Sequence, residues 1–145
     1  VAVGVDDAID TFLHYADLYG TDEKDVMIFP GGMPGSRKLA GCRPLIQAMK
    51  EHYAAGGTVA AICAAPGLVL SQMGNLEGVR FTCFEGFQDS MVAAGAVYCP
   101  QPAVTDGRII TGRSAGHAVS FALQILEKIK GADKAEEVRK AMYLD

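Results

Sequence analysis

The sequence predicts an α/β protein, a three-layer α/β/α sandwich around a mostly parallel sheet. Two uninterrupted apolar runs, 26–29 and 58–62, each stop abruptly at small residues, and patterns of helical period lie between and after them. Runs that are apolar throughout are typical of strands buried on both faces, as in parallel sheets that helices cover on either side. A third signal, an Asp-Gly pair between apolar runs near residue 106, predicts a tight hairpin beside these strands.

Composition narrows the class of protein. With 145 residues, half of them hydrophobic, the chain has the size of one domain, which we expect to span residues 1–145. A net charge of −4 without a basic cluster argues against nucleic acid or an anionic membrane as partner, and no apolar run is long enough to cross a bilayer. The four cysteines, at 42, 63, 83 and 99, lack metal-ligand spacing. No secretory signal is visible, so we expect reduced thiols and a cytoplasmic location. We also expect no metal and no organic cofactor.

The first part of the chain is expected to form a strand over 1–5 and an amphipathic helix over 6–20. The next strand, over 26–29, is broken by Pro30-Gly31-Gly32. Because glycine has no Cβ, this turn can direct its backbone N–H groups toward a ligand. An ordinary loop is the alternative interpretation of a pair of glycines.

A helix is expected from Arg43-Pro44 to Gly56-Gly57, because its apolar residues share one face and glycine commonly ends helices. The strand over 58–62 follows, and Cys63 comes directly after it. Pro66 suits the first turn of a helix, where its missing N–H costs nothing. Strand, sharp turn and helix are the features of a nucleophile elbow, in which a reactive side chain stands at the carboxyl end of a strand.

Cys63 is the candidate catalytic nucleophile. The partial positive charge and free N–H groups of a helix N-terminus favour a thiolate over a thiol. In a doubly wound sheet the carboxyl ends of the strands line one crevice, so the diglycine turn is expected beside Cys63. The backbone N–H groups of Gly31, Gly32 and Ala64 are then candidates for an oxyanion hole. The alternative is that Cys63 is one more small buried hydrophobic residue, as most free cysteines are.

The second half of the chain is expected to form strands over 79–84 and near 97, a hairpin over 104–111, and helices over 119–126 and 134–143. Asp106 and Gly107 are the expected central residues of the hairpin turn, since both types accept positive φ. Asp133 and Glu136 have the spacing of a capping box at the start of the last helix.

Two motifs together strongly resemble the ThiJ/PfpI superfamily, namely Phe29-Pro30-Gly31-Gly32-Met33-Pro34-Gly35 followed by Ala60-Ala61-Ile62-Cys63-Ala64-Ala65-Pro66. The resemblance runs from about Val26 to the helix after Gly116. It implies a flavodoxin-like fold of the class I glutamine amidotransferase-like type, a homodimer, and a link to oxidative stress. It also implies an N-terminal βαβ unit carrying an acidic residue that hydrogen-bonds the cysteine. We find no such unit in these residues, so we expect the sequence to be incomplete at its N-terminus.

The resemblance also implies which residues line the pocket. In this superfamily a histidine often follows the strand expected over 79–84, close to the nucleophile; the matching position here is expected to be Phe84, which puts a Cys-His dyad in doubt. Arg113 and His117 are pocket candidates, because the superfamily carries a turn beside the nucleophile at this point. The alternative for His117 is a plain loop residue. Cys83 is either structural or flanks the pocket.

The implied function is a cysteine-dependent activity on small reactive carbonyls, of the glyoxalase or deglycase type. The Cys63 thiolate would be the nucleophile, with the missing carboxylate or a water as general base. The alternative is a redox sensor or stress-response chaperone, because an exposed thiolate oxidises readily. A PfpI-type peptidase or an amidotransferase is disfavoured, since Ala64 stands where the peptidases have a histidine and Val119 stands where the amidotransferases have a glutamate. The expected partners are a small carbonyl substrate or an oxidant, and a second copy of the chain.

Overall fold

The main sheet of the computed structural model, which describes residues 22–144, has four strands in the order β1-β2-β6-β5. Strands β1 (Val26–Phe29), β2 (Thr58–Ile62) and β6 (Ile109–Gly112) are parallel, and β5 (Ala103–Asp106) is antiparallel to β6. The predicted α/β fold with a mostly parallel sheet is therefore confirmed. The strand and helix predicted over 1–20 lie outside the described residues.

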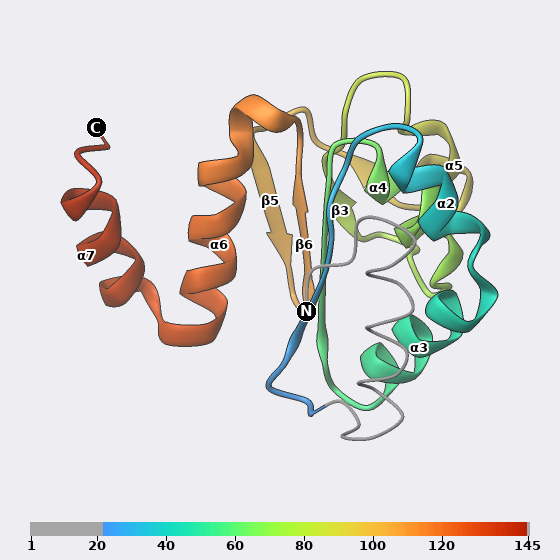
Figure 1. Ribbon diagram of the computed structural model, residues 1–145, viewed down its shortest axis with the longest axis horizontal. Coiled ribbons are helices and arrows are strands. Elements are labelled where there is room, and N and C mark those ends of the chain that lie inside the picture. Colours follow the sequence, from blue (N-terminus) through green and yellow to red (C-terminus); the bar gives the residue numbers. More distant parts are fainter. Residues whose placement is uncertain (1–21, 145) are drawn as a thin grey trace.

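Helices cover both faces of this sheet, which gives the three predicted layers (Figure 1). One face carries α2 (Gly35–Gly41), α3 (Arg43–Ala54) and α4 (Ala65–Leu68). The other face carries α6 (Ala118–Lys130), and α7 (Ala132–Ala141) packs on the outer side of α6. The remaining elements are the 3-10 turns η1 (Leu70–Gln72) and η2 (Ala115–His117), strands β3 (Arg80–Phe81) and β4 (Val97–Tyr98), and helix α5 (Asp89–Ala93).

The strands divide their side chains between two apolar cores, one on each face of the sheet. Alternate strand residues reach the larger core, under α2, α3 and α4: Met27, Phe29, Val59 and Ala61. The residues between them face α6, where the smaller core contains Ala60, Ile110, Phe121 and Ile125. Burial on both sides explains why these strands read as uninterrupted apolar runs rather than as alternating ones. None of the helices within residues 22–144 is long and apolar enough to cross a membrane.

The strand predicted over 79–84 is shorter than expected. It forms only β3, which pairs in parallel with β4 in a separate two-stranded sheet. The backbone N–H of Thr82 donates to Thr111 Oγ1 of β6 at 2.9 Å, and Thr82 Oγ1 donates to the carbonyl of Gln101 at 2.9 Å. Because Thr82 bonds to a side chain on β6, its segment is anchored to the main sheet without extending the backbone ladder.

The hairpin between β5 and β6 is present, but its predicted central residues were wrong by one position. Asp106 pairs with Ile109, so Gly107 and Arg108 form the turn, and only Gly107 has a positive φ, of 59°. The carboxylate of Asp106 accepts a hydrogen bond from the Arg80 backbone N–H at 2.9 Å. That contact holds Asp106 in the strand.

Two helix predictions also need correction. Helix α2 was not predicted, and it follows directly after the diglycine loop. The predicted capping box of Asp133 and Glu136 is wrong, because α7 begins at Ala132 after Gly131 and no side chain caps it. Glu136 lies inside the helix and bonds to Arg139 instead.

Candidate functional site

Cys63 forms a sharp elbow at the carboxyl end of β2. Its φ is 64°, in the left-handed region that residues with a Cβ rarely adopt. Its backbone N–H donates to the carbonyl of Gly112 at 3.0 Å, and its carbonyl accepts from the backbone N–H of Phe84 at 2.8 Å. A residue in such a region costs about 1–3 kcal/mol and persists only where the surroundings hold it. Here both backbone groups of Cys63 are held.

The diglycine loop lies against the side chain of Cys63. A Cβ placed on Gly31 would be 2.5 Å from Cys63 Cβ and 3.4 Å from Cys63 Sγ, so no residue larger than glycine fits without movement. Gly32 has a φ of 93° and open space around its Cα. Within residues 22–144, no acceptor is hydrogen-bonded to the backbone N–H of Gly31, Gly32 or Ala64. Unpaired donors therefore lie in the two segments that flank the sulfur.

The helix after the elbow is a single turn. Helix α4 ends at Leu68, and the carbonyl of Gly67 accepts a hydrogen bond from Ser71 Oγ at 2.6 Å. A Cβ on Gly67 would lie 1.9 Å from the carbonyl oxygen of Phe87, so this turn is also pressed against the loop before α5. One turn aligns few peptide dipoles, and the electrostatic support for a thiolate is smaller than a full helix would give.

Cys83 is completely buried next to this elbow. The residue after it, Phe84, donates the 2.8 Å hydrogen bond to the Cys63 carbonyl. Burial raises the pKa of the Cys83 thiol from 9.0 to about 11; the charges of Cys63 and Asp89 raise it further and that of Arg113 lowers it. The Cys83 thiol is therefore protonated at neutral pH. It is also close enough to Cys63 and Arg113 for their charges to act on it.

Phe84 and Arg113, two of the predicted pocket residues, come close to the elbow. Phe84 touches it through its backbone, while the residue as a whole is 47% exposed and its ring packs edge-on against Phe87. Arg113 follows Gly112, whose carbonyl holds the Cys63 N–H, and its guanidinium donates to the Pro100 carbonyl at 3.3 Å.

His117 is placed differently. Its Nδ1 shares a hydrogen bond of 2.7 Å with Ser114 Oγ at the start of α6. Within residues 22–144 no hydrogen bond joins it to Cys63. Nor does any carboxylate of these residues hydrogen-bond to Cys63, and no group of three or more His, Cys, Asp or Glu side chains among them is placed to hold a metal ion.

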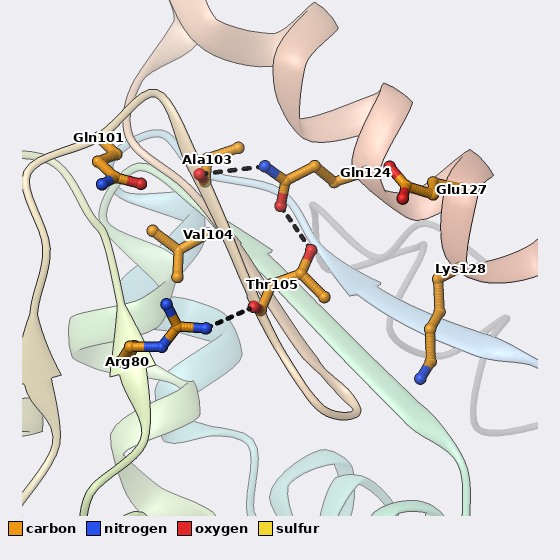
Figure 2. A pocket seen from close by; sticks show the side chains of 8 residues that line it. All are labelled: Arg80, Gln101, Ala103, Val104, Thr105, Gln124, Glu127 and Lys128. Atoms are coloured by element: carbon orange, nitrogen blue, oxygen red, sulfur yellow. Dashed lines mark hydrogen bonds between the residues drawn. The ribbon is translucent and has the colours of Figure 1, made fainter. Parts of the chain in front are cut away.

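A cavity of about 490 Å³ lies elsewhere, at the free edge of β5 (Figure 2). The side-chain amide of Gln124 donates to the carbonyl of Ala103 at 3.1 Å, and Arg80 donates to the carbonyl of Thr105 at 3.4 Å. These two side chains donate hydrogen bonds to backbone carbonyls of the edge strand β5, and this disfavours pairing of β5 with another strand. None of the predicted site residues lines this cavity.

Two residues that hold the elbow were not identified from the sequence. Gly112 accepts the Cys63 N–H, and a Cβ on it would lie 2.9 Å from atoms of both Ile62 and Phe121. Thr111 anchors the segment that leads to Cys83. A glycine at the end of a strand often marks a close approach of another chain segment, and this signal was present in the sequence.

The model of the DJ-1/PfpI family matches residues 3–128 of the chain. The chain belongs to the DJ-1/PfpI family. This confirms the resemblance that the two motifs carry. The match includes the elbow, the diglycine loop and the segment that carries Cys83.

Individual relatives agree with this assignment. The chain is 35% identical to Protein DJ-1 homolog A of Arabidopsis thaliana over 83% of its own length and 31% of that relative. It is equally similar, at 35% identity, to a Caenorhabditis elegans protein named glutathione-independent glyoxalase, over 83% of its own length and 63% of that relative. The crystal structure of Drosophila melanogaster DJ-1beta superimposes with a TM-score of 0.79 at 30% identity, covering 92% of this chain and 69% of that one. A DJ-1 superfamily protein from Salmonella typhimurium gives a TM-score of 0.78 at 30% identity, with the same coverage.

Proposed function

We propose that this protein is a glyoxalase-like enzyme that converts small α-oxoaldehydes such as methylglyoxal to 2-hydroxy acids through the Cys63 thiolate. The observation that carries the proposal is the half-buried thiol on a strained elbow, with the backbone of Gly31 against it. The relative named glutathione-independent glyoxalase supports the choice of substrate class. A homodimer and a cytoplasmic location are part of the same proposal.

The first step of the proposed reaction forms a bond between Cys63 Sγ and the aldehyde carbon. The carbonyl oxygen becomes an oxyanion, which the unpaired N–H groups of Gly31, Gly32 and Ala64 stabilise. One well-placed donor of this kind contributes roughly 10²–10³ in rate. A proton then moves from the former aldehyde carbon to the neighbouring carbon, which turns the adduct into a thioester of the 2-hydroxy acid. Water hydrolyses the thioester and restores the thiol, so the net reaction adds one water to the oxoaldehyde.

The proton transfer needs a general base, and Cys63 is not hydrogen-bonded to a carboxylate or a histidine among the described residues. In this proposal the base is a water molecule or a group outside residues 22–144. His117 is the nearest histidine in sequence to the Gly112–Cys63 contact, but Ser114 already engages its Nδ1.

Methylglyoxal consumption tests the proposal, with the 2-hydroxy acid product measured in the same samples. Cys63→Ser is expected to lose the activity, while Cys42→Ser, which changes a thiol between α2 and α3, serves as the matched control and is expected to keep it. If Cys63→Ser consumes the aldehyde as fast as the wild type, the proposal is wrong.

A redox sensor is the second candidate; what supports it is that, among residues 22–144, no histidine or carboxylate is hydrogen-bonded to Cys63. Hydrogen peroxide can reach a half-buried thiol, and oxidation of that thiol does not require the general base that enzymatic turnover needs. Peroxide titration followed by intact mass and peptide mapping tests it. Sensing is excluded if Cys63 gains oxygen no sooner than the other three cysteines.

A further inference from the structure

We propose that Cys83 is the resolving thiol of Cys63, so that a hydroperoxide converts the two residues to an intramolecular disulfide. This inference goes beyond the carbonyl chemistry and does not depend on it, because it needs only a thiol at Cys63 that an oxidant can reach. Three observations support it. The backbones of the two segments are in contact, one thiol is partly exposed while the other is buried, and the other two cysteines lie on other segments.

The backbone contact brings the segment that carries Cys83 against the elbow. The backbone N–H of Phe84 donates to the carbonyl of Cys63 at 2.8 Å, so Cys83 is the residue directly before the one that contacts the elbow. A disulfide requires Cα atoms about 4.4–6.8 Å apart, and we infer that the two residues come within this range. The electrostatic effect of Cys63 on the Cys83 thiol is in line with the same proximity.

The two sulfurs differ in access, which fixes the order of events. Cys63 is partly exposed, whereas Cys83 has no exposed surface. A hydroperoxide therefore meets Cys63 first. The other two thiols lie on other segments: Cys42 lies between α2 and α3, and Cys99 follows β4, where its backbone N–H donates to the Phe81 carbonyl and its Sγ lies 3.7 Å from the Val97 carbonyl.

The proposed step balances with a hydroperoxide as the only oxidant. The Cys63 thiolate attacks the terminal oxygen of the hydroperoxide, the O–O bond breaks, and an alcohol or water leaves with the second oxygen. Cys63 is now a sulfenic acid, oxidised by two electrons. The Cys83 sulfur then attacks the Cys63 sulfur, the S–O bond breaks, and the Cys83 proton leaves with the hydroxyl group as water.

The environment of Cys83 sets the rate of the second step. The thiolate is the attacking form, and a pKa of about 11 keeps it scarce at neutral pH. The charged groups that act on Cys83 are Cys63 and Asp89, which disfavour the thiolate, and Arg113, which favours it. Resolution is therefore expected to be slow at neutral pH and to accelerate as the pH rises.

The test treats the whole protein with one molar equivalent of hydrogen peroxide, blocks remaining thiols with iodoacetamide, and maps peptides without reduction. Trypsin cuts after Arg80, so Cys63 lies in peptide 51–80 and Cys83 in peptide 81–108. The expected product is a cross-linked pair of these peptides that separates on reduction. Because Cys99 shares the second peptide, fragmentation assigns the linked cysteine, and Cys99→Ser is expected to keep the cross-link.

Cys83→Ser supplies the second readout. In this variant the cross-link is expected to disappear, and Cys63 should gain two oxygen atoms as sulfinic acid at least several-fold faster than in the wild type. The proposal is overturned if wild-type Cys63 is oxidised without forming any cross-link, or if the cross-link joins Cys99. Should Cys83→Ser fail to fold, the identity of the wild-type cross-link decides the question alone. The carbonyl activity is measured separately on Cys63→Ser, so either proposal can fail without the other.

Discussion

Gly31→Ala is the sharpest test of the contact between the diglycine loop and the nucleophile. The new Cβ would lie 2.5 Å from Cys63 Cβ and 2.9 Å from the carbonyl oxygen of Ile62. Carbon atoms in contact prefer about 3.5–4.0 Å, so the two segments must separate by about 1 Å. Neither Cβ can rotate away, because each is fixed directly to its backbone. Overpacking of this kind typically costs about 1–3 kcal/mol.

Urea unfolding measures this cost. With a slope of about 2 kcal/mol per M, the midpoint of Gly31→Ala should fall by about 1 M. The rate at which iodoacetamide labels Cys63 should change as well, because the displaced loop lies against the sulfur. Gly41→Ala is the matched control, since no atom lies within 4 Å of its new Cβ and its φ is not positive. If Gly31→Ala and Gly41→Ala have the same midpoint, the inferred packing of the loop on Cys63 is refuted.

Three further outcomes are expected. The free energy of unfolding in urea should fall by about 1–2 kcal/mol between about pH 9 and pH 11, because the Cys83 pKa is raised to about 11 in the folded state and the unfolded chain releases that proton first. Cys83→Ser should flatten this decline. An equally steep decline in the variant would contradict the raised pKa of Cys83. Arg108→Ala should lower the free energy of unfolding by about 2–3 kcal/mol in the same assay. Arg108 Nη1 donates to the carbonyls of Tyr53 at 2.6 Å and Gly57 at 2.7 Å, and the guanidinium lies 4.0 Å from the ring centre of Tyr53. A loss below about 0.5 kcal/mol would show that water replaces these contacts. Glu136 should titrate with a pKa of about 2 by NMR, because Arg139 hydrogen-bonds to its carboxylate. Arg139→Met should return that pKa toward its ordinary range. An unchanged pKa in the variant would exclude the Glu136–Arg139 ion pair in solution.

The strands of the main sheet could be predicted because burial on both faces leaves a plain signal, an apolar run without alternation. The hairpin turn could not be placed to the residue in the same way. Asp106 and Gly107 satisfy the local preferences of a turn, yet Asp106 is held in β5 by the backbone N–H of Arg80, 26 residues away in sequence. Contacts of that separation decide such one-residue shifts, and local propensity carries no information about them.

For the candidate site, the neighbourhood of Gly31 and Cys63 follows from the topology. Strands β1 and β2 are parallel neighbours with Phe29 opposite Ala61, so the residues two positions further on, Gly31 and Cys63, stand at the same level. The position of Cys83 has no such origin. It depends on the side-chain hydrogen bond between Thr82 and Thr111, which replaces a backbone ladder and leaves no periodic pattern in the sequence.

The contrast between Cys63 and Cys83 has a physical origin in how each is attached to the sheet. Cys63 follows the last residue of the central strand β2, and its backbone turns out of the strand direction at φ 64°. Its side chain is partly exposed. Cys83 follows a segment anchored on β6, and burial raises its pKa and keeps it protonated. Under the two proposals, the partly exposed Cys63 meets the small electrophile or oxidant, and the buried Cys83 acts only after Cys63 has reacted. Adjacent thiols in such unequal environments can work in sequence, whereas two equally exposed thiols would compete for the same reagent.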